Sequence, residues 1–218
     1  MTAQLTKLMG EIRACRVCVT APQGTPLPHE PRPVFQLSAE AKLAICGQAP
    51  GTRVHASGVP FTDRSGDRLR DWLGLSSDQF YDCRHVAVIP MGFCFPGQTA
   101  SGADLPPRAE CARTWHDQLM TALPQLRLVL AVGGYAIAYH MAEQKGLPLW
   151  RVVADFNDKL ERGEIGMKKQ AQGRLVLPLP HPSWRNNHWL KKHRWFERDY
   201  LPLVRREVAT VLGHSGDG

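Results

Sequence analysis

Four short apolar runs along the chain predict four buried β-strands. They span residues 41–46, 85–89, 126–132 and 173–177. Glycine or proline closes the first three runs, at Gly47, Pro90 and Gly133. Because these residues punctuate regular structure, each run reads as one complete strand that leads into a turn.

Apolar residues at helical spacing predict helices around and between these strands. They form these groups: Leu5, Leu8, Met9 and Ile12; Leu69, Trp72 and Leu73; Cys111, Trp115, Leu119 and Leu123; Tyr135 to Ala142; and Trp189 to Val211, with a break near Pro202. Residues 144–172 read as a looser segment, and residues 52–58, with Arg53, His55 and Gly58, as a flexible one. Ser65 is expected to cap the helix that holds Leu69.

Strands that alternate with helices predict a parallel sheet covered on both faces. The expected fold class is therefore α/β, a three-layer α/β/α sandwich around a central four-stranded parallel sheet. The chain has 218 residues, of which 43% are hydrophobic, and this length suits one domain over residues 1–218.

The chain is basic, with a formal net charge of +7. Part of the excess lies in residues 185–198, where Arg, Lys and His alternate with Trp189, Trp195 and Phe196 just after Trp184. This mixture suits a polyanion with stackable bases, although a solvated basic helix face is the common alternative. No run is long and apolar enough to span a bilayer, and no export signal is recognisable, so we expect a cytoplasmic protein.

Six cysteines in a chain without an export signal point to metal ligands or reduced thiols. Cys15 and Cys18 form a C-x2-C pair, and Cys94 and Cys111 add two thiols with sixteen residues between them. Four such cysteines can hold an iron-sulfur cluster or a structural zinc ion. Cys46 and Cys83 are expected to be ordinary thiols.

His181 stands out among the candidate functional residues. Pro180 and Pro182 flank it just after the fourth predicted strand, so the imidazole would sit on a stiff loop at the carboxyl edge of the sheet. Open α/β sheets bind their ligands at that edge. The alternative is a proline-rich surface turn with an incidental histidine.

Several motifs in this order resemble one known family. They are the turn Gly47-Gln48-Ala49-Pro50-Gly51, Pro60-Phe61, Gly66, Cys94, Cys111, the strand-Gly-helix unit at residues 126–142 and His181-Pro182-Ser183. Together they resemble the uracil-DNA glycosylase superfamily, closest to its iron-sulfur family 4 branch. The resemblance covers roughly residues 5 to 200, and its ordered set is more specific than any one motif.

The resemblance implies a DNA repair enzyme that flips uracil out of the stack and hydrolyses its N-glycosidic bond. His181 would donate a hydrogen bond to uracil O2, Phe61 would stack on the base, and the turn formed by Gly47, Gln48, Ala49, Pro50 and Gly51 would line the opposite side. Ser183 belongs to the same motif, and Trp184, Arg185 and Asn186 would form the wedge that fills the vacated stack. Cys15, Cys18, Cys94 and Cys111 would hold a [4Fe-4S] cluster that orders the DNA-facing loops without taking part in the chemistry.

The chain departs from the family pattern in its wedge, which is bulky, polar and cationic where the family has an apolar residue, and at three further positions. Gln48 replaces the glutamate of the first motif, and an amide cannot accept a proton at neutral pH. Pro90 replaces the asparagine that reads the uracil edge. Asp63 takes the place of a glycine and is a plausible replacement carboxylate, with His55 and Asn187 as weaker candidates for the same role.

Two function classes follow from this pattern. The first is an active uracil-DNA glycosylase, working as a monomer on single- or double-stranded DNA. The second is a non-catalytic protein that binds uracil-containing or single-stranded DNA through its basic aromatic stretch. The histidine on its rigid loop favours the enzyme, because a DNA-binding protein needs no donor for the base oxygen.

Overall fold

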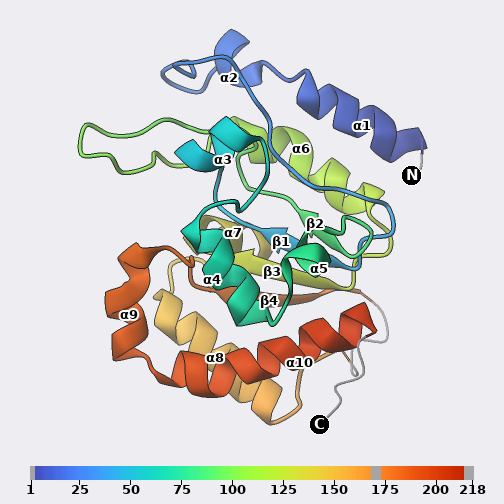
Figure 1. The fold of residues 1–218 in the computed structure, drawn as a ribbon, viewed down its shortest axis with the longest axis vertical. Coiled ribbons are helices and arrows are strands. Elements are labelled where there is room, and N and C mark those ends of the chain that lie inside the picture. Colours follow the sequence, from blue (N-terminus) through green and yellow to red (C-terminus); the bar gives the residue numbers. More distant parts are fainter. Residues whose placement is uncertain (1–2, 168–172, 214–218) are drawn as a thin grey trace.

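A computed structural model describes residues 3–167 and 173–213 of the chain (Figure 1). Its centre is a four-stranded parallel sheet in the order β2-β1-β3-β4. The strands are β1 (Leu43–Cys46), β2 (Val86–Val88), β3 (Leu128–Val132) and β4 (Leu175–Leu179). The four apolar runs are thus confirmed as strands, and the parallel register follows from the helical crossovers between them.

The two faces of the sheet bury side chains of different size. Leu43, Ile45, Leu128 and Leu130 point into one large core, whereas Ala44, Cys46, Val129 and Ala131 belong to the core on the other side. Because successive side chains in a strand face opposite ways, one strand supplies both cores.

Helices cover both faces, as Figure 1 shows. The α-helices are α1 (Ala3–Arg13), α2 (Val17–Thr20), α3 (Thr52–Ser57), α4 (Arg64–Leu73), α5 (Ser77–Tyr81), α6 (Ala109–Ala122), α7 (Gly134–His140), α8 (Leu149–Glu161), α9 (Asn187–Lys192) and α10 (Leu201–Leu212). Buried residues of α4, α8 and α10 pack on the face with the larger side chains, and those of α1, α6 and α7 on the other. The expected three-layer α/β/α sandwich is confirmed.

Two segments expected to lack regular structure are helical. Residues 52–57 form α3, and α8 occupies thirteen residues of the 144–172 segment. In α8, Val152, Phe156 and Leu160 recur every four residues and face the cores, so this segment carries the apolar period of a helix. Residues 168–172 of that segment lie outside the described residues.

The predicted position of the break in the last helix was wrong. The chain leaves α9 after Lys192 and re-enters a helix at the π-helical turn Phe196–Tyr200, which continues directly into α10. Pro202 lies in the first turn of α10. A proline at this position is compatible with a helix because its fixed φ of about −65° is close to the helical value.

The parallel arrangement brings the ends of β1 and β4 to the same edge of the sheet. The turn at residues 47–51 and the loop at residues 180–186 therefore meet there, as expected for the carboxyl edge of an open α/β sheet. None of the helices in the described part of the chain is long and apolar enough to cross a membrane.

Candidate active site

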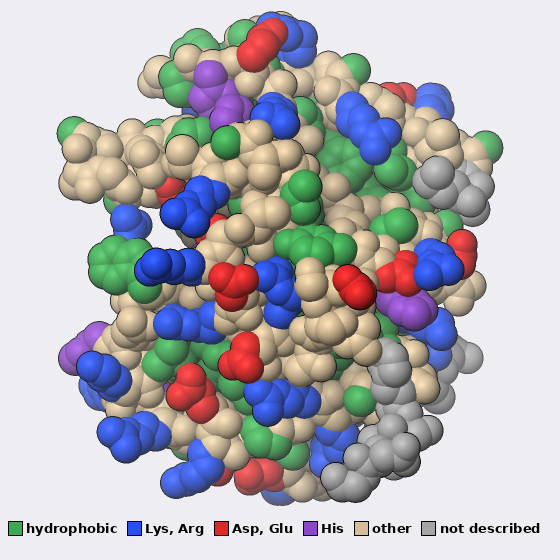
Figure 2. Space-filling model, in the orientation of Figure 1, with side chains coloured by type: hydrophobic (Ala, Val, Ile, Leu, Met, Phe, Trp, Pro, Cys, Tyr) green, Lys and Arg blue, Asp and Glu red, His purple; other side chains and the backbone are tan. Residues whose placement is uncertain are grey.

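A cavity of about 550 Å³ opens at this carboxyl edge. Most of its wall comes from the turn after β1, the segment that enters α4, the loop between β2 and α6, and the loop after β4, and the start of α3 adds Thr52, Arg53 and Val54. Residues lining it include Gly47, Gln48, Ala49, Pro50, Gly51, Phe61, Asp63, Pro90, Asp104, His181, Ser183, Trp184, Arg185 and Asn186. Figure 2 shows the molecule hollowed at its left edge, below a projecting loop, with Lys and Arg side chains around the hollow.

His181 is held in the cavity wall by contacts on both sides. Its backbone carbonyl accepts a hydrogen bond from the Asn186 side chain at 2.7 Å. Its side chain lies against Gly133, where a Cβ would come within 3.5 Å of the His181 Cβ. Gly133 has φ +85°, a conformation that favours glycine, so the backbone conformation beside His181 selects this residue.

The protonation of His181 follows from one hydrogen bond. The backbone N–H of Ser183 donates to Nδ1 at 3.3 Å. Because an amide N–H is only a donor, Nδ1 must be the acceptor, and the ring proton of the neutral imidazole then sits on Nε2. The tautomer is thus assigned from the hydrogen bond that the other ring nitrogen makes.

Burial lowers the pKa of His181, and the carboxylates of Asp63 and Asp104 partly oppose this shift. Removal from water penalises the imidazolium form, whereas nearby negative charges favour it. Because the pKa of His181 is lowered overall, the ring is neutral at neutral pH. The site therefore contains a neutral Nε2–H donor with two carboxylates within electrostatic range.

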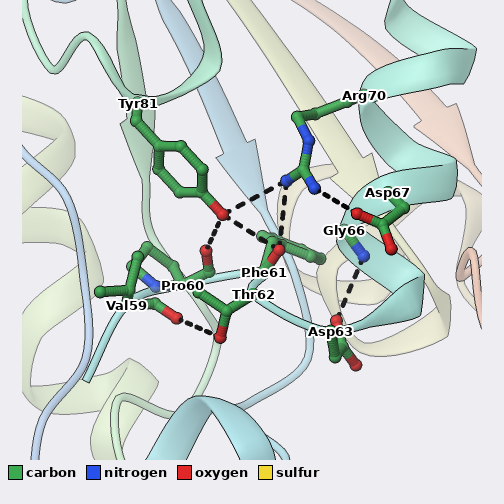
Figure 3. A network of polar contacts seen from close by, with 9 residues as sticks. All are labelled: Val59, Pro60, Phe61, Thr62, Asp63, Gly66, Asp67, Arg70 and Tyr81. Carbon is green, nitrogen blue, oxygen red and sulfur yellow. Dashed lines mark hydrogen bonds and ion pairs between the residues drawn. The ribbon is translucent and has the colours of Figure 1, made fainter. Parts of the chain in front are cut away.

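Phe61 reaches the cavity from a strained backbone position (Figure 3). Its φ is +54°, the only positive value among the described non-glycine residues. The Tyr81 hydroxyl at 3.1 Å and the Arg70 guanidinium at 3.2 Å hold its carbonyl oxygen. Its ring packs over Gly47, where a Cβ would come within 3.2 Å of ring carbon Cζ. Such a conformation costs on the order of 1–3 kcal/mol and persists only where surrounding contacts fix it.

Asp63, and not Ser65, caps helix α4. The Asp63 side chain accepts a hydrogen bond from the backbone N–H of Gly66 at 3.1 Å, as Figure 3 shows. The prediction of Ser65 as the cap was wrong because Ser65 already lies inside the first turn. Since the cap uses Oδ1, the second carboxylate oxygen of Asp63 has no partner among the described residues and remains available at the cavity.

Backbone contacts fix the turn after β1 against the segment after β2. The amides of Met91 and Gly92 donate to the carbonyl oxygens of Gly47 and Gln48 at 2.8 and 2.9 Å. The neighbouring carbonyl of Pro90 lies 2.9 Å from Nε2 of the buried His116. Pro90 therefore forms a rigid part of the wall and offers the ligand no side-chain hydrogen bond.

The loop after His181 forms the rim of the cavity. Trp184 is 72% exposed, the largest exposed fraction among the large hydrophobic residues described. The Arg185 guanidinium carbon lies 5.8 Å from the centre of the Trp184 ring, and its Nη2 donates to the Gly102 carbonyl at 3.3 Å. Asn186 has its amide nitrogen engaged by His181, so it supports the loop as well as lining the cavity.

The two weaker candidates for a base do not line the cavity. His55 packs beside His29, with ring centres 4.6 Å apart, and beside Phe95. Asn187 accepts a hydrogen bond from Arg68 at 2.9 Å. Neither is among the described residues that form the wall, so neither is placed to act on a ligand there.

The four cysteines of the predicted cluster site lie within electrostatic range of one another. The pKa of Cys111 is raised mainly by burial and also by Cys94, Cys18 and Cys15. Cys18 and Cys94 share an apolar cluster with Leu27, and the Phe93 amide donates to the Cys111 sulfur at 3.3 Å. Within residues 3–167 and 173–213, no group of three or more His, Cys, Asp or Glu side chains is arranged to hold a single metal ion.

The other two cysteines lie elsewhere. Cys46 is buried inside β1, and burial raises the pKa of its thiol to about 12. Cys83 is half-buried just before β2. Neither contributes to the pKa shift of the clustered thiols.

The sequence prediction missed Asp104, a cavity residue from the loop between β2 and α6. The only sequence signal for this loop is the glycine-rich stretch between Cys94 and Cys111, which reads as a turn. Nothing in that pattern reveals that the turn folds back to the His181 loop.

The family comparison agrees with this geometry. The family model described as "Uracil DNA glycosylase superfamily" matches residues 34–205, which include all four strands and every cavity residue named above.

Proposed function

Because the chain belongs to the uracil DNA glycosylase superfamily, we propose that it removes uracil from DNA by hydrolysing the N-glycosidic bond. The substrate is uracil-containing DNA, the products are free uracil and an abasic site, and the role is base excision repair. The observation that carries the proposal is the neutral His181, which carries its ring proton on Nε2 and lines a cavity at the carboxyl edge of the sheet.

The size of the cavity supports a flipped nucleotide as the ligand. A base inside a duplex is not accessible, so the enzyme must extrude it into a pocket. A cavity of about 550 Å³ is within the usual range for small-ligand sites. The Phe61 ring, fixed by the carbonyl contacts of its own backbone, offers an aromatic face on which the base can stack.

His181 supplies stabilisation of the leaving group. As the C1′–N1 bond breaks, its electron pair moves to the uracil ring and negative charge develops on the ring oxygens. A preorganised N–H donor beside such an oxygen is worth about 2.7–4 kcal/mol of transition-state stabilisation. A neutral donor suffices here, because the imidazole does not have to give up its proton to stabilise this charge.

The sugar side of the reaction needs negative charge and a water molecule. Gln48 cannot accept a proton, so the carboxylate must come from another residue that lines the cavity. Asp63 fits this role because only one of its two oxygens is used by the helix cap. Since departure of the base dominates the barrier, a weak base such as a carboxylate is adequate.

The donor set of Cys15, Cys18, Cys94 and Cys111 fits a [4Fe-4S] cluster. In such a cluster each thiolate binds a different iron, so the four sulfurs need not converge on one ion as they do around zinc. The backbone N–H of Phe93 donates a hydrogen bond to the Cys111 sulfur, and hydrogen bonds to cluster sulfurs tune the reduction potential of such clusters. Bound there, the cluster would tie α2 to α6 and order the loops beside the cavity. On this basis we propose that the chain is nearest the iron-sulfur family 4 branch.

A second candidate function is DNA binding without turnover. The exposure of Trp184 favours it, as does the absence of acidic residues from position 181 to 196. In Figure 2, Lys and Arg side chains gather at the lower left, where Figure 1 places α9. This surface suits a phosphate backbone with stackable bases in either function.

The test is to incubate the protein with single- and double-stranded oligonucleotides that carry one uracil, and then to cleave abasic sites with alkali. We expect strand cleavage with uracil and none with thymine at the same position. Tight binding without cleavage on every uracil substrate would instead support the binding protein.

A further inference from the structure

The loop between the two later cysteines folds into a short hairpin beside the cavity. The amide of Leu105 donates to the Gly97 carbonyl at 2.9 Å, and that of Thr99 to the Ala103 carbonyl at 2.8 Å. Gln98 and Asp104 form an antiparallel bridge between the two arms. In Figure 1 this hairpin is the green loop that projects at the left, and we call residues 97–105 the cysteine-loop hairpin.

Asp104 is oriented within this hairpin. Gln98 Nε2 donates to Asp104 Oδ1 at 3.0 Å. The other oxygen, Oδ2, has no hydrogen-bond partner among the described residues and lies 3.5 Å from the position that a Cβ on Gly51 would take. Since Gly51 belongs to the turn after β1, the free oxygen of Asp104 lies directly beside the cavity wall.

The hairpin also contacts the His181 loop. Arg185 Nη2 donates to the Gly102 carbonyl at 3.3 Å, which joins the hairpin to the rim that follows His181. Asp104 and Asp63 are the two carboxylates that raise the pKa of His181 against the effect of burial. The cavity therefore holds two negative charges from separate segments of the chain.

Asp104 is exposed, which places it at the mouth of the cavity and not at its floor. When a base enters such a pocket, the sugar stays at the mouth because it remains joined to the DNA backbone. A charge at the mouth thus faces the sugar, whose C1′ becomes positive as the base departs. DNA that covers the mouth also removes water, which strengthens this interaction.

We propose that Asp104 is a second catalytic carboxylate, delivered by the cysteine-loop hairpin to stabilise the sugar cation and to hold the attacking water. This inference rests on the proposed function of the same site. The C1′–N1 bond breaks with its electron pair on the base, the water oxygen bonds to C1′, and one water proton passes to a carboxylate. The departed base then takes a proton from solvent, which completes the hydrolysis.

The test compares two uncleavable DNA ligands. One carries a neutral tetrahydrofuran in place of the abasic sugar, and the other a pyrrolidine whose protonated nitrogen replaces C1′. An ion that mimics the transition state binds more tightly where the site stabilises that charge. We expect Asp104→Asn to weaken binding of the pyrrolidine DNA by about tenfold or more, because a charge-assisted contact is lost, and to leave binding of the tetrahydrofuran DNA unchanged or slightly improved.

Two further variants test the placement of Asp104. Gln98→Ala keeps the Asp104 carboxylate but removes the hydrogen bond that orients it. This variant should lose part of the preference for pyrrolidine DNA over tetrahydrofuran DNA, and less than Asp104→Asn loses. Asp71→Asn, on the exposed side of α4, removes one carboxylate away from the cavity and should not alter the preference for pyrrolidine DNA. If Asp104→Asn fails to fold, the Gln98→Ala result decides.

If Asp104→Asn loses affinity equally for both DNAs, the hairpin only positions DNA and the inference is overturned. Unchanged affinity for both DNAs would also overturn it. The ligand measurements do not depend on turnover. A wild-type protein that prefers the pyrrolidine through Asp104 but excises no uracil would refute the proposed function and support the carboxylate assignment. Uracil excision at full single-turnover rate in Asp104→Asn would refute the assignment and leave the function standing.

Discussion

The backbone amide of Ser183 donates a hydrogen bond to Nδ1 of His181 at 3.3 Å, and this contact leaves the ring proton on Nε2. Two residues of one rigid loop therefore determine which nitrogen can serve as a donor in the cavity. Burial lowers the pKa of the same ring. The neutral donor is thus present at and above the ordinary histidine pKa of about 6.5, and it is lost only when the pH falls below that value.

Ser183→Pro tests this contact with little change to the backbone. Ser183 has φ −63°, a value that proline adopts, so the substitution removes the N–H without forcing a new conformation. We expect the single-turnover rate to fall by up to about tenfold, since a neutral hydrogen bond contributes about 0.5–1.5 kcal/mol. Ser183→Ala, which keeps the N–H and loses only the hydroxyl, should stay near the wild-type rate. Equal rates for the two variants would remove the basis for the tautomer assignment.

Gly66→Ala tests the support of Phe61. A Cβ on Gly66 would lie 1.8 Å from the Phe61 carbonyl oxygen, so the strained turn shown in Figure 3 cannot accept it. We expect the free energy of unfolding to drop by about 3 kcal/mol or more and uracil excision to be lost. Gly10→Ala is the matched control: nothing lies within 4 Å of its Cβ position inside α1, so it should stabilise the protein by about 0.5–1 kcal/mol. Urea unfolding of both variants gives the comparison.

Metal analysis tests the cluster. Protein purified without oxygen should be brown and contain more iron than zinc, and Cys94→Ser should lose iron and solubility before it loses the chemistry of any folded fraction. Cys83→Ser should keep its iron, because Cys83 is not among the grouped thiols. Stoichiometric zinc with no iron would contradict the cluster and favour a structural zinc site.

The salt dependence of DNA binding tests the basic surface of α9. If phosphate contacts dominate, the logarithm of the association constant falls linearly with the logarithm of salt concentration. Lys191→Ala should flatten that slope by up to about one unit. Lys42→Ala removes an exposed lysine that precedes β1, at the opposite edge of the sheet from the cavity, and should leave the slope unchanged. A salt-independent affinity would exclude α9 as the docking surface.

The sheet could be predicted from the sequence because each strand is a local apolar run closed by a turn residue. Helix α8 was not predicted, although its apolar residues recur at a regular helical period; flanking glycines at positions 146 and 163 limit the segment on both sides. The sequence predicted a break at Pro202 because proline disrupts the interior of a helix. The structure places this proline at the start of α10, and the break lies earlier, after α9.

The candidate site, like the fold, has residues that the sequence could predict and residues that it could not. His181, Phe61 and the 47–51 turn belong to local motifs, and the structure places them around one cavity. Asp104 could not be found from sequence, because its role depends on a hairpin that folds back to residues about eighty positions later. Asn187 lies near His181 in sequence, but its side chain accepts a hydrogen bond from Arg68, more than a hundred positions away, and does not line the cavity.

The most direct test of the account is single-turnover release of uracil from DNA by the wild-type protein and by His181→Ala. If Nε2–H of His181 stabilises the departing base, the variant should be slower by roughly a hundredfold or more, corresponding to about 2.7–4 kcal/mol, while its affinity for the DNA changes little. A His181→Ala protein that releases uracil at the wild-type rate, or a wild-type protein that releases none, would contradict the account.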